Sequence, residues 1–185
     1  MGYFPLCVDI RDKKVLLVGD GPQIRDKMEK LTPFGAVRIR CTCLKPADLT
    51  DAGAFVVAGD LDPAESERVS TLCRAHGVPI NVVDQPALCT FFFPAIIARG
   101  DLTVSVSTGG RVPGASALIR QRIGELLPDE MDGILDWIED LRENLHATLS
   151  KANARAVLRE ATCRAFDMGR PLEDAEMMDI FGEIW

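Results

Sequence analysis

The sequence predicts an α/β protein in which an N-terminal Rossmann-like, doubly wound parallel sheet precedes an all-helical region. Short apolar runs alternate with helical stretches up to about residue 112, and only helical spacing follows them. The chain has 185 residues, 47% of them hydrophobic and 26% charged, a balance typical of a globular protein with a sizeable core. We therefore expect an α/β domain over residues 1–113 and a helical region over residues 114–185.

The first strand is expected over residues 14–18, where branched apolar residues run up to Gly19, as in a strand buried on both faces. Helical spacing of Ile24, Met28 and Leu31 predicts the helix that follows. Because strands and helices go on alternating, the sheet should be parallel. The remaining expected elements of this part are strands over residues 37–40, 55–59, 78–83 and 102–107 and a helix over residues 63–76.

The helical region shows four stretches of helical spacing, interrupted at Pro128 and Gly169. We expect helices over residues 115–127, 130–149, 152–168 and about 172–185. Trp137 and Leu141 lie one turn apart and belong to an apolar stripe. Such a stripe indicates a packed core or a dimer interface more often than a cofactor site.

Composition excludes several classes of protein. A formal net charge of -7 argues against a nonspecific nucleic-acid surface, which needs clustered Lys and Arg. No apolar run reaches the roughly 18 residues needed to cross a bilayer, and the first residues do not resemble a signal peptide. The 6 cysteines are too sparse for a disulfide scaffold. We therefore expect a cytoplasmic protein with reduced thiols and neither membrane nor nucleic-acid partners.

The Gly19-Asp20-Gly21 turn lies between a strand and a helix, where glycines and a helix N-terminus can hold the pyrophosphate of a dinucleotide. Two features depart from that pattern. Ile24 occupies the third small position of the fingerprint, and Asp20 adds a negative charge beside the phosphate site. A sharp strand–helix turn without a ligand is the alternative.

An acidic residue that binds the adenosine ribose is expected about 20 residues after the turn. The sequence has Arg40 and Cys41 there instead, and Arg40 either faces a 2′-phosphate or lies at a solvated strand end. The choice between NAD and NADP stays open. The candidate cofactor-binding residues are Gly19, Asp20, Gly21, Pro22, Gln23, Arg40, Cys41, Gly59 and Asp60.

Several short motifs occur in order along the chain and span about residues 3–128. The segments are Tyr3-Phe4-Pro5-Leu6, Asn81-Val82-Val83-Asp84, Leu88-Cys89, Phe91-Phe92-Phe93-Pro94-Ala95, residues 100–110, Ile119-Arg120-Gln121-Arg122-Ile123 and Glu125-Leu126-Leu127-Pro128. The ordered set is more specific than any single motif. Together these segments resemble precorrin-2 dehydrogenase, the dehydrogenase module of siroheme synthase.

The resemblance implies a cytosolic homodimer whose domain 1–113 binds NAD and whose region 114–185 dimerises and covers a tetrapyrrole. The implied reaction is oxidation of precorrin-2 to sirohydrochlorin by hydride transfer to NAD+. Some family members also insert Fe2+ or Co2+, which would be a substrate. Cys41 and Cys43 are too few for a structural zinc site, so we predict no resident metal. A noncatalytic tetrapyrrole- or nucleotide-binding protein is the alternative function.

Asp84 follows an expected strand and matches the proposed catalytic aspartate of the family, which would accept a proton as a general base. A turn-forming Asp before Gln85 and Pro86 is the alternative. Precorrin-2 carries eight carboxylates, so hydroxyls, backbone N–H groups and arginines are expected around it. The candidate substrate-binding residues are Asn81, Ser107, Thr108, Gly109, Gly110, Arg111 and Arg120, and a Gly-Gly turn with solvated arginines is the alternative.

Overall fold

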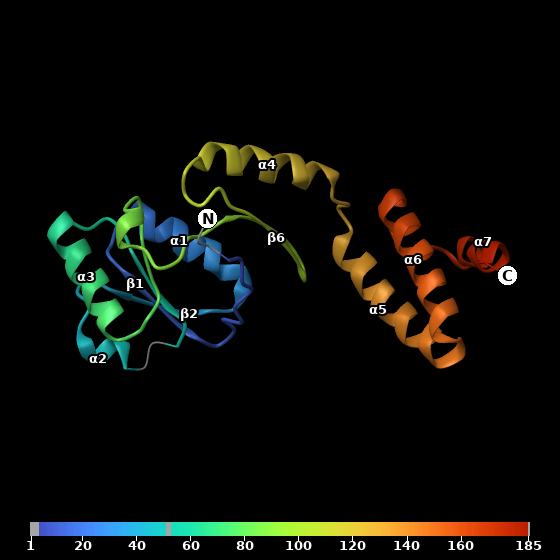
Figure 1. The fold of residues 1–185 in the computed structure, drawn as a ribbon, viewed down its shortest axis with the longest axis horizontal. Coiled ribbons are helices and arrows are strands. Elements are labelled where there is room, and N and C mark those ends of the chain that lie inside the picture. Colours follow the sequence, from blue (N-terminus) through green and yellow to red (C-terminus); the bar gives the residue numbers. More distant parts are fainter. Residues whose placement is uncertain (1–3, 51–52, 185) are drawn as a thin grey trace. The chain divides into compact units, whose positions relative to one another are not determined.

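The computed structural model describes residues 4–50 and 53–184 (Figure 1). The chain packs as two compact units. The first comprises residues 1–94 and 107–113, and the second comprises residues 95–106 and 114–185. The expected division at residue 113 differs from this grouping in one segment, residues 95–106, which packs with the helices.

A four-stranded parallel sheet forms the first unit and confirms the predicted Rossmann-like fold. The strand order is β2-β1-β3-β4, with every neighbouring pair parallel. The strands are β1 (Lys14–Val18), β2 (Val37–Cys41), β3 (Phe55–Ala58) and β4 (Ile80–Val82). The helices and 3-10 turns of this unit are α1 (Pro22–Leu31), η1 (Thr32–Phe34), α2 (Pro46–Leu49), α3 (Pro63–Ala75) and η2 (Pro86–Leu88).

Strand β1 lies in the middle of the sheet and is buried on both faces. Val15 and Leu17 point into one apolar layer with Ile24 of α1. Leu16 and Val18 point into the other, with Val69 of α3. Side chains on both faces of β1 are therefore buried, which explains why every residue from Val15 to Val18 is apolar.

The expectation that residues 102–107 form a further parallel strand is wrong. They form β6 (Leu102–Val106), which pairs antiparallel with β5 (Ala95–Arg99) in a separate two-stranded sheet. Only two residues connect these strands, whereas a parallel connection needs a crossover of a dozen or more. Arg99 anchors the hairpin, because its guanidinium donates to the carbonyls of Leu127 and Pro128, both at 2.6 Å.

The four expected helices of the second part are confirmed as α4 (Pro113–Leu126), α5 (Met131–Thr148), α6 (Lys151–Met168) and α7 (Asp174–Ile184). The stripe containing Trp137 and Leu141 packs, half-buried, on the core of α5, α6 and α7. Small residues of α6, Ala161 among them, are buried in this core.

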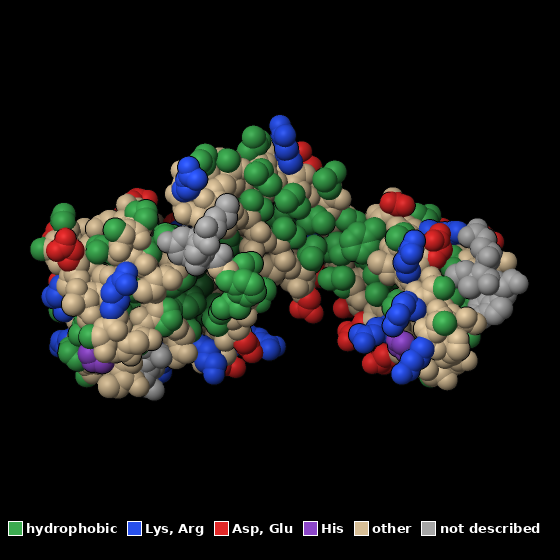
Figure 2. Space-filling model, viewed as in Figure 1, with side chains coloured by type: hydrophobic (Ala, Val, Ile, Leu, Met, Phe, Trp, Pro, Cys, Tyr) green, Lys and Arg blue, Asp and Glu red, His purple; other side chains and the backbone are tan. Residues whose placement is uncertain are grey.

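Helix α4 keeps large apolar side chains at its surface. Leu118, Ile119 and Leu126 are exposed by 50%, 44% and 83%. Figure 2 shows hydrophobic side chains gathered on the surface around α4.

Gly19 has a geometric reason to be glycine. Its φ is +120°, and an added Cβ would overlap the carbonyl oxygen of Gly59 at the end of β3. We expect Gly19→Ala to lower the free energy of unfolding by at least about 1–3 kcal/mol, because backbone strain adds to the overlap. Urea unfolding followed by circular dichroism measures this.

The matched control is Gly133→Ala in the first turn of α5, where an added Cβ meets nothing within 4 Å. Alanine is the better helix former, so this variant should equal the wild type or gain up to about 1 kcal/mol. Equal stability of Gly19→Ala and the wild type would contradict the geometric argument.

The start of α7 is held by an ion pair that responds to pH. Arg170 donates from both terminal nitrogens to the Glu176 carboxylate, at 2.8 and 3.0 Å, and the backbone N–H of Glu173 adds a third bond at 2.7 Å. The Arg170 hydrogen bond, followed by that of Glu173, lowers the pKa of Glu176 from 4.5 to about 2.

A lowered pKa in the folded state stabilises the fold above the unfolded value and loses that effect as pH falls. We therefore expect the stability advantage of the wild type over Glu176→Gln to be complete above about pH 5 and to shrink between pH 4.5 and 2. Chemical unfolding of both proteins across this range measures it. A constant difference at every pH would disprove the contribution of this pair.

Candidate functional site

A cleft of about 230 Å³ opens where β3 and β4 end and α1 begins. In parallel sheets, ligands bind beyond the carboxyl ends of the strands, and this cleft has that position. Its lining residues are Gln23, Gly59, Asp60, Leu61, Ser66, Val82, Val83, Asp84 and Gln85.

Asp84 follows β4 at the edge of the cleft, with its side chain exposed. Its φ is +60°, a left-handed conformation that Asp and Asn adopt more readily than most residues. The turn is closed by the backbone N–H of Gln85, which donates to the Val82 carbonyl at 3.2 Å. The Asp84 carboxylate accepts a hydrogen bond of 2.7 Å from the side-chain amide of Gln23.

Gln23 lies in the first turn of α1 and bridges the ends of two strands. Its Nε2 donates to Asp84 after β4, while its Oε1 accepts from the backbone N–H of Asp60 after β3, at 2.9 Å. Gly59 leaves room for this side chain, because an added Cβ would lie only 3.2 Å from Oε1 of Gln23. The amide therefore fixes the orientation of the Asp84 carboxylate.

Asp60 also has a left-handed backbone, with φ +57°. Its carboxylate oxygen Oδ2 accepts a hydrogen bond of 3.2 Å from the backbone N–H of Ile24 in the first turn of α1. The carboxylate lies directly against Gly21, where an added Cβ would overlap it. The amino end of α1 thus holds an anionic group of the chain itself.

The predicted cofactor residues form a glycine turn of the dinucleotide-binding kind, with the Asp60 side chain lying against it. Gly19 and Gly21 supply the tight turn, and Ile24 is fully buried beneath it without separating α1 from the sheet core. Pro22 stands at the first helical position and provides no N–H. The turn therefore has the shape, but a carboxylate lies where a phosphate would approach.

Arg40 and Cys41 lie at the end of β2, as expected for residues near a ribose. The Arg40 guanidinium forms an ion pair with Asp20 of the glycine turn, and both side chains are largely exposed. Cys41 is half-buried, and burial raises the pKa of its thiol. Arg40 thus neutralises the extra charge that Asp20 brings to the turn.

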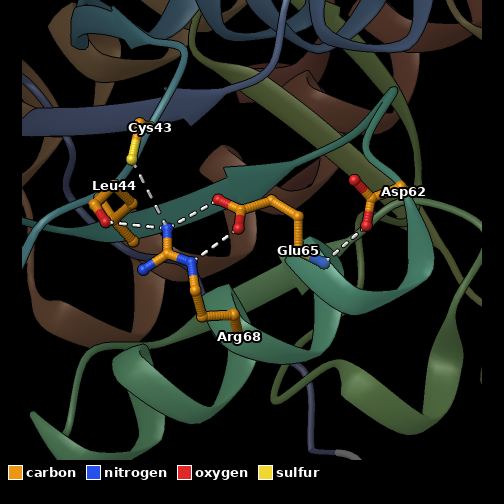
Figure 3. Close-up of polar contacts among 5 residues, drawn as sticks. All are labelled: Cys43, Leu44, Asp62, Glu65 and Arg68. Carbon is orange, nitrogen blue, oxygen red and sulfur yellow. Dashed lines mark hydrogen bonds and ion pairs between the residues drawn. The ribbon is translucent and has the colours of Figure 1, made fainter.

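The loop that carries Asp60 is anchored at the start of α3 (Figure 3). The Asp62 carboxylate accepts from the backbone N–H of Glu65 at 2.9 Å and caps the helix. Arg68 donates to both carboxylate oxygens of Glu65 at 2.6 Å and to the Leu44 carbonyl at 3.0 Å. The Asp62 cap thus ties the end of the loop to α3, while Arg68 ties α3 to the segment after β2.

Lys27 is a site residue that the sequence did not single out. It lies one turn after Gln23 on the same helix face, with its side chain only 16% exposed. Its ammonium lies 5.1 Å from the centre of the Phe93 ring. Burial and the charge of Lys30 lower its pKa, while Asp26 and Asp84 oppose the change. The spacing of four residues from Gln23 was the available signal.

The predicted substrate residue Asn81 is buried in β4, with 6% of its surface exposed. Its side-chain amide donates to the Phe91 carbonyl at 3.0 Å. The neighbouring Cys89 thiol donates to the Val82 carbonyl at 3.2 Å, and burial raises its pKa. In this structure Asn81 holds the chain that returns past β4, and its contact with a substrate stays a prediction.

The predicted loop from Ser107 to Arg111 belongs to the same compact unit as Asp84. It forms a tight turn in which the Ser107 hydroxyl accepts from Gly109 N–H at 3.1 Å. Gly109 and Gly110 have φ values of +64° and +77°. Arg120 is exposed on α4 and belongs to the other unit, so a joint role with Asp84 stays a prediction.

Across residues 4–50 and 53–184, no helix is both long and apolar enough to cross a membrane. The same ranges contain no group of three or more His, Cys, Asp or Glu side chains placed to hold a metal ion.

Comparison with known proteins confirms the resemblance to siroheme synthases. A family model described as putative NAD(P)-binding matches residues 37–95. Siroheme synthase of Methylococcus capsulatus is 33% identical over 88% of this chain, and that of Azotobacter vinelandii is 36% identical over 69%. The chain spans 38% and 32% of the lengths of these two relatives.

A solved structure named "SirC, precorrin-2 dehydrogenase" matches 98% of this chain and 98% of its own, with a TM-score of 0.68 and 15% identity. At this identity the match shows the shared fold, with the α/β sheet followed by C-terminal helices.

Removal of the Asn81 side chain tests its structural role. We expect Asn81→Ala to lower the free energy of unfolding by about 1–3 kcal/mol, because the partly buried Phe91 carbonyl loses its donor. Thermal and urea unfolding measure this. Thr71→Ala on the exposed surface of α3 is the control and should change stability by less than about 0.5 kcal/mol. If Asn81→Ala is as stable as the wild type, Asn81 does not have this structural role, and the predicted substrate contact becomes the better explanation of the residue.

Proposed function

We propose that this relative of the siroheme synthases is an NAD-dependent precorrin-2 dehydrogenase that produces sirohydrochlorin. The observation that carries the proposal is the Asp84 carboxylate, which lies at the carboxyl end of β4 beside the glycine turn. Sequence similarity to siroheme synthases over most of the chain and the fold shared with a precorrin-2 dehydrogenase support it.

The reaction removes a hydride and a proton from precorrin-2. Bound NAD+ would supply the hydride acceptor. Asp84 is exposed at the cleft, so its carboxylate can accept the proton as a general base. Gln23 acts as a positioning residue, because its amide fixes that carboxylate against the end of α1.

Recognition of the tetrapyrrole rests on groups suited to its carboxylates. Lys27 provides a largely buried ammonium, and the Ser107–Arg111 turn presents hydroxyls, backbone N–H groups and a guanidinium. Arg120 of α4 would add a second guanidinium. We further propose that the protein is a cytoplasmic homodimer and that the exposed apolar side chains of α4 form part of the interface. As a separate proposal, Fe2+ or Co2+ is an additional substrate.

A noncatalytic tetrapyrrole- or nucleotide-binding protein is the second candidate. The position of the Asp60 carboxylate at the amino end of α1 favours it, since a bound phosphate would have to displace that group. An anaerobic absorbance assay with precorrin-2 and NAD+, NADP+ or no cofactor separates the two. Sirohydrochlorin formation supports the dehydrogenase, and tetrapyrrole binding without turnover supports the second candidate.

We expect Asp84→Asn to reduce turnover of precorrin-2 by at least about 100-fold, because asparagine cannot act as the general base. Asparagine tolerates the left-handed backbone and still accepts a hydrogen bond from Gln23, so the fold should survive. Steady-state assays together with circular dichroism measure both effects.

The matched control is Asp62→Asn, which removes the same charge from the α3 cap and should keep the wild-type rate, since asparagine caps a helix as well as aspartate. A wild-type rate for Asp84→Asn would rule out Asp84 as the base.

A further inference from the structure

We propose that the Asp60 carboxylate competes with the pyrophosphate of the dinucleotide for the amino end of α1 and thereby sets the affinity for the cofactor. This inference rests on the proposed use of a dinucleotide at the glycine turn. It goes beyond that function, because it assigns to an acidic residue of the cofactor site the role of an internal competitor.

The position of the carboxylate is the first observation. Two features of a dinucleotide fold normally receive the pyrophosphate: the glycine that lets the backbone approach closely, and the unpaired N–H groups of the first helical turn. Asp60 occupies both here. Its carboxylate lies against Gly21 and accepts from Ile24 N–H at 3.2 Å.

Two positions at this end of α1 bring the carboxylate and the pyrophosphate into competition. Pro22 provides no N–H at the first helical position, and the N–H of Ile24 is bonded to Asp60. A pyrophosphate carries negative charge as the carboxylate does, so the two groups repel each other as well as compete for the same partners. Bound cofactor and the observed Asp60 rotamer therefore exclude each other.

The backbone of Asp60 is fixed, so only its side chain has to move. Its N–H donates to Gln23 at 2.9 Å, and the Asp62 cap anchors the following residues to α3. Asp60 is exposed to solvent, which gives its carboxylate a place to turn. A rotation of this side chain opens the site without rearranging the loop.

Asp20 carries the other carboxylate near the turn, and its contacts differ from those of Asp60. It forms an ion pair with Arg40, which offsets its charge. Asp60 is instead the carboxylate bonded to the helix end. We therefore assign the competition to Asp60 and not to the acidity of the turn in general.

The test measures binding by calorimetry at low ionic strength, with NAD+, ADP-ribose and adenosine as ligands. Asp60→Asn keeps the shape of the side chain and suits the φ of +57° but removes the charge. It should bind NAD+ and ADP-ribose about 2- to 5-fold more tightly than the wild type. Adenosine, which lacks phosphate, should bind with unchanged affinity, and added salt should reduce the gain.

Two further variants complete the comparison. Asp60→Gly also suits the left-handed backbone, removes the side chain altogether and should gain at least as much. Asp62→Asn removes one charge from the same loop but leaves the helix cap in place, so its affinities should match the wild type. Circular dichroism confirms that each variant is folded.

Unchanged or weaker binding of NAD+ by both Asp60 variants would overturn the inference, as would an equal gain in Asp62→Asn. Failure of the wild type and both variants to bind NAD+ would overturn it too, because Asp60 would then not be what limits binding. Precorrin-2 turnover by the wild type is assayed separately. Tighter NAD+ binding by the Asp60 variants without precorrin-2 turnover by the wild type would support the inference and reject the dehydrogenase. Turnover by the wild type without tighter binding by the variants would support the dehydrogenase and reject the inference.

Discussion

The parallel pairing of β1 with β2 and β3 is the constraint on which the rest of the site depends. Parallel strands place all their carboxyl ends at one edge, so residues 20, 60 and 84 lie along that edge although they are far apart in sequence. The two-sided burial of β1 holds this strand in the middle of the sheet, because any other position would expose its apolar side chains to water. The chemistry of the edge therefore follows from the hydrophobic interior.

Much of this fold was accessible to sequence analysis, because its elements have strong local signals. The buried run before Gly19 and the long helices of the second unit have clear periods and clear ends. The β5–β6 hairpin was not accessible in the same way. The composition of Leu102–Val106 does not distinguish a parallel from an antiparallel strand. Its partner strand, Ala95–Arg99, directly follows an aromatic segment and was not predicted as a separate strand.

The sequence predicted some of the residues that line the cleft but not their contacts. Asp84, Asp60, Gly59 and Gln23 were all expected, and they meet in one cleft. Their roles depend on side-chain geometry that spacing does not encode. Nothing in the sequence around Gln23 indicates that its amide reaches two strand ends, or that Asp60 turns toward α1. Lys27 was missed because the aromatic ring that it lies against, Phe93, is distant in sequence.

The Gln23 bridge also gives the protein a built-in reporter. The backbone amide proton of Asp60 is bonded to the same side chain that holds Asp84. Exchange of that proton with solvent deuterium requires the bond to Gln23 to open. The protection of this proton therefore reports how often the arrangement that orients the Asp84 carboxylate opens. Hydrogen exchange at the Asp60 amide can thus follow the motion of the Asp84 loop without a probe attached to that loop.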